Sequence, residues 1–131
     1  MGATRPTGAR SEGIKMGIYK IVKEKETTER NHSVQHSIKN YLTKDFSKDF
    51  SLAVSELKDG GHETTKSIAS DRIYYFITAN ATFTINDETI VVNDGDVLFI
   101  EKDTFYSFKG NFKAVLINIP AFGIQNDVNI S

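Results

Sequence analysis

Two short aromatic segments hold the side chains of this 131-residue chain that are best suited to binding a small molecule. In "RIYYFIT", Arg72, Tyr74 and Phe76 occupy every second position, and in "TFYSF" Tyr106 and Phe108 do the same. Alternate residues of a β-strand share one face, so each segment would present its polar and aromatic groups together. A guanidinium binds carboxylates and phosphates through its planar fork. A face of this composition is suited to a site for a small anionic or polar organic molecule if it points into the fold.

The three histidines do not indicate a metal site. His32 and His36 are four residues apart, a spacing that aligns them only on a helix, and the surrounding "NHSVQHSIKN" is a poor helix candidate. We interpret both as surface or loop residues. His62 follows a Gly-Gly pair and is interpreted as an exposed turn residue, with a place at the mouth of the site as the alternative. The chain has no cysteine, which excludes disulfides, thiolate metal sites and a cysteine nucleophile.

The composition is that of an ordinary soluble domain. Hydrophobic residues make up 39% and charged residues 25% of the chain, and the net charge of -1 gives no drive toward nucleic acid or membrane. No apolar run approaches the roughly 20 residues that span a bilayer, and the N-terminus has no apolar signal segment. We expect a cytoplasmic protein, with residues 1–15 as a disordered tail and 16–131 as a single domain whose core covers about 48–120.

Short β-type runs separated by turn signals follow the N-terminal tail. We predict strands at 17–23, 50–57, 72–78, 81–85, 89–92, 97–100, 105–108 and 112–119. Turns are predicted at 58–62, 86–88, 101–103 and 109–111. Residues 121–131 are expected to pack one turn against the domain and then to fray. Strands of this length at this spacing, with no long helix, favour an all-β sandwich or barrel.

The order of strands and turns over residues 57–118 resembles the cupin family. Gly95-Asp96 followed by the apolar strand Val97–Ile100 matches the second cupin motif, in which Tyr106 stands where a histidine is usual. Gly60-Gly61 and the strand that begins at Arg72 match the first motif. The resemblance implies a double-stranded β-helix, or jelly-roll barrel.

The usual cupin metal ligands are missing from this sequence. Arg72 stands at the usual glutamate position, and the two remaining histidine positions fall on Lys66 and Ile68 or on Thr65 and Ser67, depending on the register. A permanently charged guanidinium repels a divalent cation. We therefore expect no metal and no cofactor.

The resemblance also implies which side chains point into the barrel. It places Arg72, Tyr74 and Phe76 inside, together with Thr104, Tyr106 and Phe108. The predicted ligand-binding residues are Arg72, Tyr74, Tyr106, Lys66, Phe76 and Phe108. In the alternative interpretation Arg72 only pairs with Asp71, Glu63 or Glu101, and the tyrosines close the core.

These observations predict a metal-independent cupin domain that binds a small anionic or polar organic ligand. Arg72→Ala is expected to remove binding with little loss of fold. One alternative is an isomerase, epimerase or lyase, in which Tyr106 or Tyr74, its pKa lowered by the cation, is the acid and His62 the base. Another is a non-catalytic interaction or regulatory β-domain.

The opposite face of the same strand carries Ile73, Tyr75 and Ile77, which is too apolar to remain in water. Because cupins commonly pair through such sheets, the resemblance implies a homodimer. Covering of this face by the N-terminal strands is the alternative.

Overall fold

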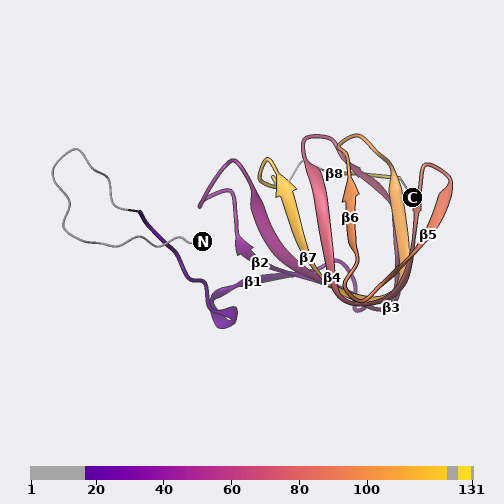
Figure 1. Ribbon diagram of the computed structural model, residues 1–131, viewed down its shortest axis with the longest axis horizontal. Coiled ribbons are helices and arrows are strands. Elements are labelled where there is room, and N and C mark those ends of the chain that lie inside the picture. Colours follow the sequence, from indigo (N-terminus) through magenta and orange to yellow (C-terminus); the bar gives the residue numbers. More distant parts are fainter. Residues whose placement is uncertain (1–16, 124–126, 131) are drawn as a thin grey trace.

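Eight β-strands and one 3-10 turn make up the secondary structure in the computed structural model, which describes residues 17–123 and 127–130 (Figure 1). The predicted tail at residues 1–15 lies outside this part of the chain. The elements are η1 (Glu24–Glu26), β1 (Thr28–Asn31), β2 (His36–Leu42), β3 (Ser51–Ser67), β4 (Asp71–Ile85), β5 (Glu88–Asn93), β6 (Val97–Ile100), β7 (Tyr106–Ile119) and β8 (Asp127–Ile130).

All neighbouring strands are antiparallel and hydrogen-bonded into one sheet that curls into a barrel (Figure 1). The strand order is β1-β2-β3-β7-β4-β5, with β6 paired to β4 and β8 paired to β3. The all-β prediction is confirmed. No helix in the described ranges has the length and apolar character needed to cross a bilayer.

Three long strands continue through positions at which the sequence pattern predicts a turn or a break. The predicted turn at 58–62 lies within β3, the one at 109–111 lies within β7, and the segments 72–78 and 81–85 form the single strand β4. Each strand bends through an irregularity rather than ending. The β3–β7 register shifts between Leu57 and Gly60, the β4–β7 register shifts after Phe76, and Gly110 has a φ of 120°. Bulges of this kind bend a strand while its ladder continues.

The two ends of the domain also differ from the prediction. Residues 17–23 form no strand, and Ile18 and Tyr19 are more than four-fifths exposed, so the predicted strand there is wrong. The sheet instead begins at β1 and β2. Near the other end, the segment expected to pack as one turn contains β8, which pairs with Thr64–Ser67 of β3.

Aromatic side chains dominate the barrel interior. Phe76, Phe83 and Phe112 are almost fully buried, and the ring centroids of Phe83 and Phe108 lie 5.0 Å apart. Most of the contacts between these rings are edge-to-face or tilted, the arrangements that aromatic quadrupoles favour. This cluster fills part of the barrel, and a cavity lined by both polar and apolar side chains lies next to it.

Candidate functional site

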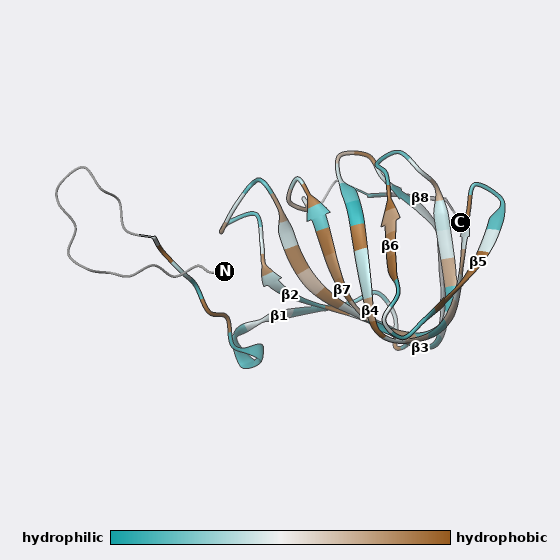
Figure 2. Cartoon of the chain, in the orientation of Figure 1, coloured by the Kyte–Doolittle hydropathy of each residue, from teal (hydrophilic) through white to brown (hydrophobic). Residues whose placement is uncertain are grey.

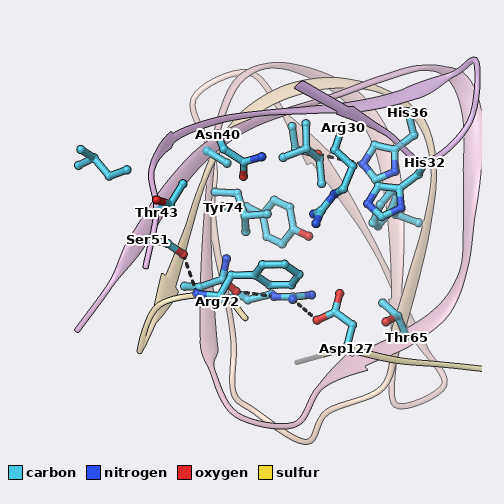
Figure 3. Close-up of a pocket in the computed structure, with 18 of the residues that line it drawn as sticks. Arg30, His32, His36, Asn40, Thr43, Ser51, Thr65, Arg72, Tyr74 and Asp127 are labelled. Atoms are coloured by element: carbon cyan, nitrogen blue, oxygen red, sulfur yellow. Dashed lines mark hydrogen bonds and ion pairs between the residues drawn. The ribbon is translucent and has the colours of Figure 1, made fainter. Parts of the chain in front are cut away.

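A cavity of about 70 Å³ lies inside the barrel between the aromatic core and the strands β1, β2 and β8. Its boundary with the core is formed by Tyr74, Tyr106, Phe108 and Leu116, which belong to both. The other lining residues are Arg30, His32, His36, Ile38, Asn40, Leu42, Thr43, Ser51, Ala53, Ser55, Thr65, Arg72, Asn118, Phe122 and Asp127. Figure 3 shows that Arg30 and the two histidines lie across this space from Arg72 and Asp127.

Arg72 is the most extensively bonded side chain of the cavity. It projects inward from β4 and is 4% exposed. Its Nε donates to Asn118 Oδ1 at 2.8 Å, its Nη1 donates to the Tyr106 hydroxyl at 2.8 Å, and its Nη2 forms an ion pair with Asp127 Oδ1. Burial alone would lower the pKa of Arg72, but Tyr106, Tyr74 and Asp127 outweigh burial and raise it. Arg72 therefore stays charged, and each of its three side-chain nitrogens has a partner.

The counter-ion of Arg72 is not one of the acids expected from the sequence. Asp71 points elsewhere and accepts a hydrogen bond from the backbone N–H of Lys102 at 2.9 Å. Glu101 is exposed at the turn after β6, and the side chain of Glu63 lies outside the described part of the chain. Asp127 reaches Arg72 because β8 pairs with β3 beside the cavity. Sequence separation hid this contact, since the two residues are 55 positions apart.

The two phenols form a hydrogen-bonded pair at the cavity floor. The hydroxyl oxygens of Tyr74 and Tyr106 are 3.0 Å apart, and both side chains are buried. Burial raises the pKa of Tyr74, and the neighbouring Tyr106 raises it further, against the opposing effect of Arg72. The expectation of a lowered pKa is wrong for Tyr74, because desolvation exceeds the attraction of the cation. Tyr74 is a neutral hydrogen-bonding group near neutral pH.

Arg30 is a second cavity cation that the sequence pattern did not single out. It projects from β1, is half-buried, and its guanidinium carbon lies 4.9 Å from the centroid of the Phe122 ring. Its Nε is buried and has no hydrogen-bond partner within the described chain. Burial lowers the pKa of Arg30; Asp127 raises it, and the positive charge of Arg72 lowers it again. The sequence alone could not place Arg30 in the cavity, because its position there depends on the pairing of β1 with β2.

His36 also belongs to the cavity, and its interpretation as a surface or loop residue is wrong. It is 4% exposed on β2, and its Nε2 lies 3.1 Å from the Ser55 hydroxyl on β3. His32 is exposed at the rim and stacks on His36 with ring centroids 4.8 Å apart. The alternation of His36 with the buried Ile38 is the sequence signal that indicates a strand rather than a loop.

The predicted ligand-binding residues separate into two groups. Arg72, Tyr74, Tyr106 and Phe108 meet at the cavity, whereas Phe76 lies in the aromatic core. Lys66 is on the outer face of β3, where its Nζ lies 4.7 Å from the centroid of the Phe105 ring, which corrects its predicted place in the pocket. His62 lies on β3 opposite Phe108, and its side chain lies outside the described part of the chain.

Among the two registers considered for the usual histidine positions, the structure selects Thr65 and Ser67. Both are buried, while Ile68 is exposed. The residues at the usual cupin ligand positions are thus two hydroxyls, the guanidinium of Arg72 and the phenol of Tyr106. This donor set does not fit a divalent cation, which cupin-type sites hold with imidazole and carboxylate groups. In the part of the chain that is described, no three His, Cys, Asp or Glu residues cluster as a metal site would require.

Comparison with known families places most of the chain in one family. Residues 4–121 match the family described as ethanolamine utilisation protein EutQ. The chain belongs to the EutQ family. This is a cupin-type family, so the predicted cupin fold is confirmed. No protein of curated function matches the chain significantly.

Solved structures similar to this EutQ-family chain are also cupin barrels. A variant of PAC13 from Streptomyces with uridine has a TM-score of 0.76 at 21% identity, covering 88% of this chain and 92% of its own. PAC13 is described as a nucleoside dehydratase. KdgF from Halomonas sp. has a TM-score of 0.69 at 11% identity, covering 80% and 96%. Oxalate decarboxylase from Bacillus subtilis has a TM-score of 0.72 at 16% identity, covering 87% of this chain and 33% of its own. At these identities the similarity shows the fold alone.

Proposed function

We propose that this EutQ-family chain is a metal-independent cupin domain that binds a small organic anion or polar molecule in its barrel cavity. The observation that carries the proposal is the charge of the cavity. Two guanidiniums, Arg30 and Arg72, face a single carboxylate, Asp127, in a partly enclosed space. Such an excess of buried positive charge favours an anionic guest.

The size of the cavity limits the ligand. A volume of about 70 Å³ lies well below the roughly 300 Å³ at which ordinary ligand pockets begin. Since one water molecule needs about 10–15 Å³ on this measure, the space holds on the order of five water-sized groups. A nucleoside such as the uridine of PAC13 is larger than this, so a short acid fits better.

The donor set supports a site that works without a metal ion. Thr65, Ser67, Arg72 and Tyr106 replace the usual cupin ligands, and Arg72 brings a charge that opposes a cation. Stoichiometric metal in protein purified from cells would contradict this part of the proposal.

A second candidate function is an isomerase, epimerase or lyase acting on a sugar-like or acidic substrate. The His36–Ser55 pair favours it, because an imidazole bonded to a hydroxyl in a cavity can accept a proton. The neutral phenol of Tyr74, which shares a hydrogen bond with the Tyr106 hydroxyl, also lines the cavity. The third candidate, a non-catalytic interaction domain, has less support, since its interior would be filled.

We also propose that two chains pair through the outer face of β4 and β6. Tyr75 and Ile77 are 46% and 44% exposed, and Phe99 of β6 is 57% exposed. β6 is apolar throughout its length (Figure 2). Of the described N-terminal strands, β1 pairs with β2 and β2 pairs with β3, so neither covers this face.

A cavity-filling variant tests the binding function directly. Ala53 lines the cavity, so Ala53→Leu places three further carbon atoms there without removing a polar group. Its neighbour Val54 lies on the opposite face of β3, which makes Val54→Leu a matched control. A panel of small organic acids and hydroxy acids is titrated into each protein and followed by NMR of the backbone amides.

We expect at least one acid to shift amide signals of β2, β3 and β4 in the wild type and the control, and to bind Ala53→Leu at least about tenfold more weakly, since filling the cavity removes the site. Failure of the whole panel to bind, or equal binding to Ala53→Leu, would overturn the proposed function.

A further inference from the structure

The cavity contains one anion position that the chain fills and a second cation that it does not neutralise. The filled position is at Arg72, whose three hydrogen-bonding nitrogens are taken by Asn118, Tyr106 and Asp127. A ligand that approached Arg72 would have to displace its internal carboxylate. Arg72 is therefore better suited to shape the cavity than to contact the guest.

Arg30, unlike Arg72, has no hydrogen-bond partners among the described residues that a ligand would have to displace. Its side chain makes no direct hydrogen bond or ion pair within the described ranges, and its Nε is nevertheless removed from solvent. Both guanidiniums lie near the Phe122 ring: the guanidinium carbon of Arg30 is 4.9 Å, and that of Arg72 5.9 Å, from the ring centroid. The Phe122 backbone N–H in turn donates to the Ser51 hydroxyl at 2.9 Å, which ties the backbone at this residue to β3. A buried, oriented donor without an acceptor costs stability unless a guest supplies the acceptor.

We propose that Arg30 is the ligand-charge recognition residue of this cavity, and that it binds the carboxylate of a small monocarboxylic acid while Asp127 remains on Arg72. The inference rests on the proposed binding function and specifies its ligand class. The rest of the acid lies against Ile38, Leu116 and Ser55, which line the same space.

The charge balance selects a monoanion over a dianion. Arg30 and Arg72 contribute two positive charges and Asp127 one negative charge, so one further negative charge neutralises the cavity. A dicarboxylate would bring its second charge close to Asp127, and like charges at short range in a partly desolvated site repel strongly. Asp127 thus acts as the residue that sets the preferred charge of the guest.

Titrations of the full chain with lactate and malonate near neutral pH test this assignment. We expect the wild type to bind lactate at least about tenfold more tightly than malonate, and Arg30→Gln to weaken lactate by at least about tenfold, as expected for loss of one charge-assisted pair. Arg30→Lys keeps the positive charge but not the planar guanidinium, so its affinity for lactate should lie between those of the wild type and Arg30→Gln. Lys102→Gln removes one exposed charge away from the cavity and should bind lactate as the wild type does.

Asp127→Asn provides the reciprocal test, because it adds one net positive charge while keeping an oxygen that can accept from Arg72. We expect it to shift the ratio of affinities toward malonate by at least about tenfold. Circular dichroism and urea titration of each variant establish that it is folded.

Undiminished lactate binding by Arg30→Gln, or preference of the wild type for malonate, would overturn the inference even without Asp127→Asn. If lactate binding is lost in Ala53→Leu but kept in Arg30→Gln, the cavity function stands and the role of Arg30 fails. If lactate does not bind the wild type, this inference fails, and the wider panel decides the proposed function.

Discussion

Arg72 is buried in a set of contacts made entirely within the chain, which changes what its removal should do. Arg72→Ala leaves Asp127, Tyr106 and Asn118 without their shared partner. Removing one member of a buried ion pair costs about 3–5 kcal/mol, and the partial exposure of Asp127 places this case near 3 kcal/mol. Urea denaturation measures the change. The earlier expectation of little loss of fold is therefore replaced by one of marked destabilisation.

Lys102→Ala, at an exposed turn, is the control for Arg72→Ala and should change the free energy of unfolding by less than about 0.5 kcal/mol. Equal stability of Arg72→Ala and this control would mean that the Arg72–Asp127 pair contributes nothing to the fold.

Tyr74 should make the protein sensitive to alkali. Burial raises its pKa in the folded state above the ordinary value of about 10 that it has when unfolded. The folded state then holds its proton more tightly, so the contribution to stability is complete below about pH 10 and is lost as the pH rises above that value toward the folded pKa. In Tyr74→Phe, the free energy of unfolding should fall less between pH 9 and pH 11.5 (values chosen to bracket about 10) than in the wild type.

Tyr75→Phe serves as the control for this pH dependence, since Tyr75 is about half exposed on the outer face. Its free energy of unfolding should fall at alkaline pH as much as that of the wild type does. If the free energy of unfolding of Tyr74→Phe falls at alkaline pH as steeply as that of the wild type, groups other than Tyr74 cause the pH dependence.

The sequence predicts the half of the cavity built from the central strands and misses the half built from the terminal ones. Strand alternation is local and placed Arg72 and Tyr74 on one strand face, and the resemblance to cupins placed Tyr106 with them inside the barrel. Arg30 and Asp127 enter the cavity only because β1 and β8 pair with distant segments. The residues next to Arg30 and Asp127 in the sequence carry no sign of that pairing, which depends on how the whole sheet assembles.

At the scale of elements, Gly110 is the point at which β7 bends inside the sheet. Its φ of 120° disfavours side chains, and a Cβ added there would lie 2.6 Å from the carbonyl oxygen of Asn80 on β4. Gly110→Ala should therefore lower the free energy of unfolding by about 3 kcal/mol, measured by urea denaturation, because both strain and a backbone clash arise.

Gly95 offers a comparison in which only the backbone strain is present. It has a φ of 85° in the turn before β6, but a Cβ there would meet no atom within 4 Å. Gly95→Ala should cost only about 1 kcal/mol. If the two alanine variants prove equally stable, the close approach of β7 to β4 is not what requires glycine at position 110.

The same bends explain why the number of strands was overestimated in the middle of the chain. Glycine, asparagine and aspartate mark both tight turns and bulges, since both need unusual backbone angles. The Asn86–Asp87 pair is a real turn, with φ of 51° and 69°, and it was predicted correctly. Around Gly60 and Gly110 the ladder continues across the bend, and only pairing between strands distinguishes the two cases.

At the scale of the whole molecule, the open apolar face predicts association. With Phe99 and Tyr75 exposed on adjoining strands, Phe99→Lys should convert a dimer into a monomer in analytical ultracentrifugation, because a buried lysine without a partner opposes the contact. Val34→Lys, in the exposed turn before β2, should leave the dimer unchanged. A monomeric wild type at high concentration would contradict the proposed pairing.

The continuity of β3, β4 and β7 through the bends has a consequence for how the molecule opens. These strands are 17, 15 and 14 residues long and lie next to one another, with β7 in the centre. Because β7 is hydrogen-bonded to β3 on one side and to β4 on the other, neither neighbour can separate without breaking a long ladder to β7. Amide hydrogens of β7 should thus exchange with deuterium only through global unfolding, at one common free energy. Those of β1, a four-residue edge strand, should exchange through local fraying at much lower cost. The rim of the cavity that carries Arg30 would then be the part of the barrel that opens first, while its floor stays closed.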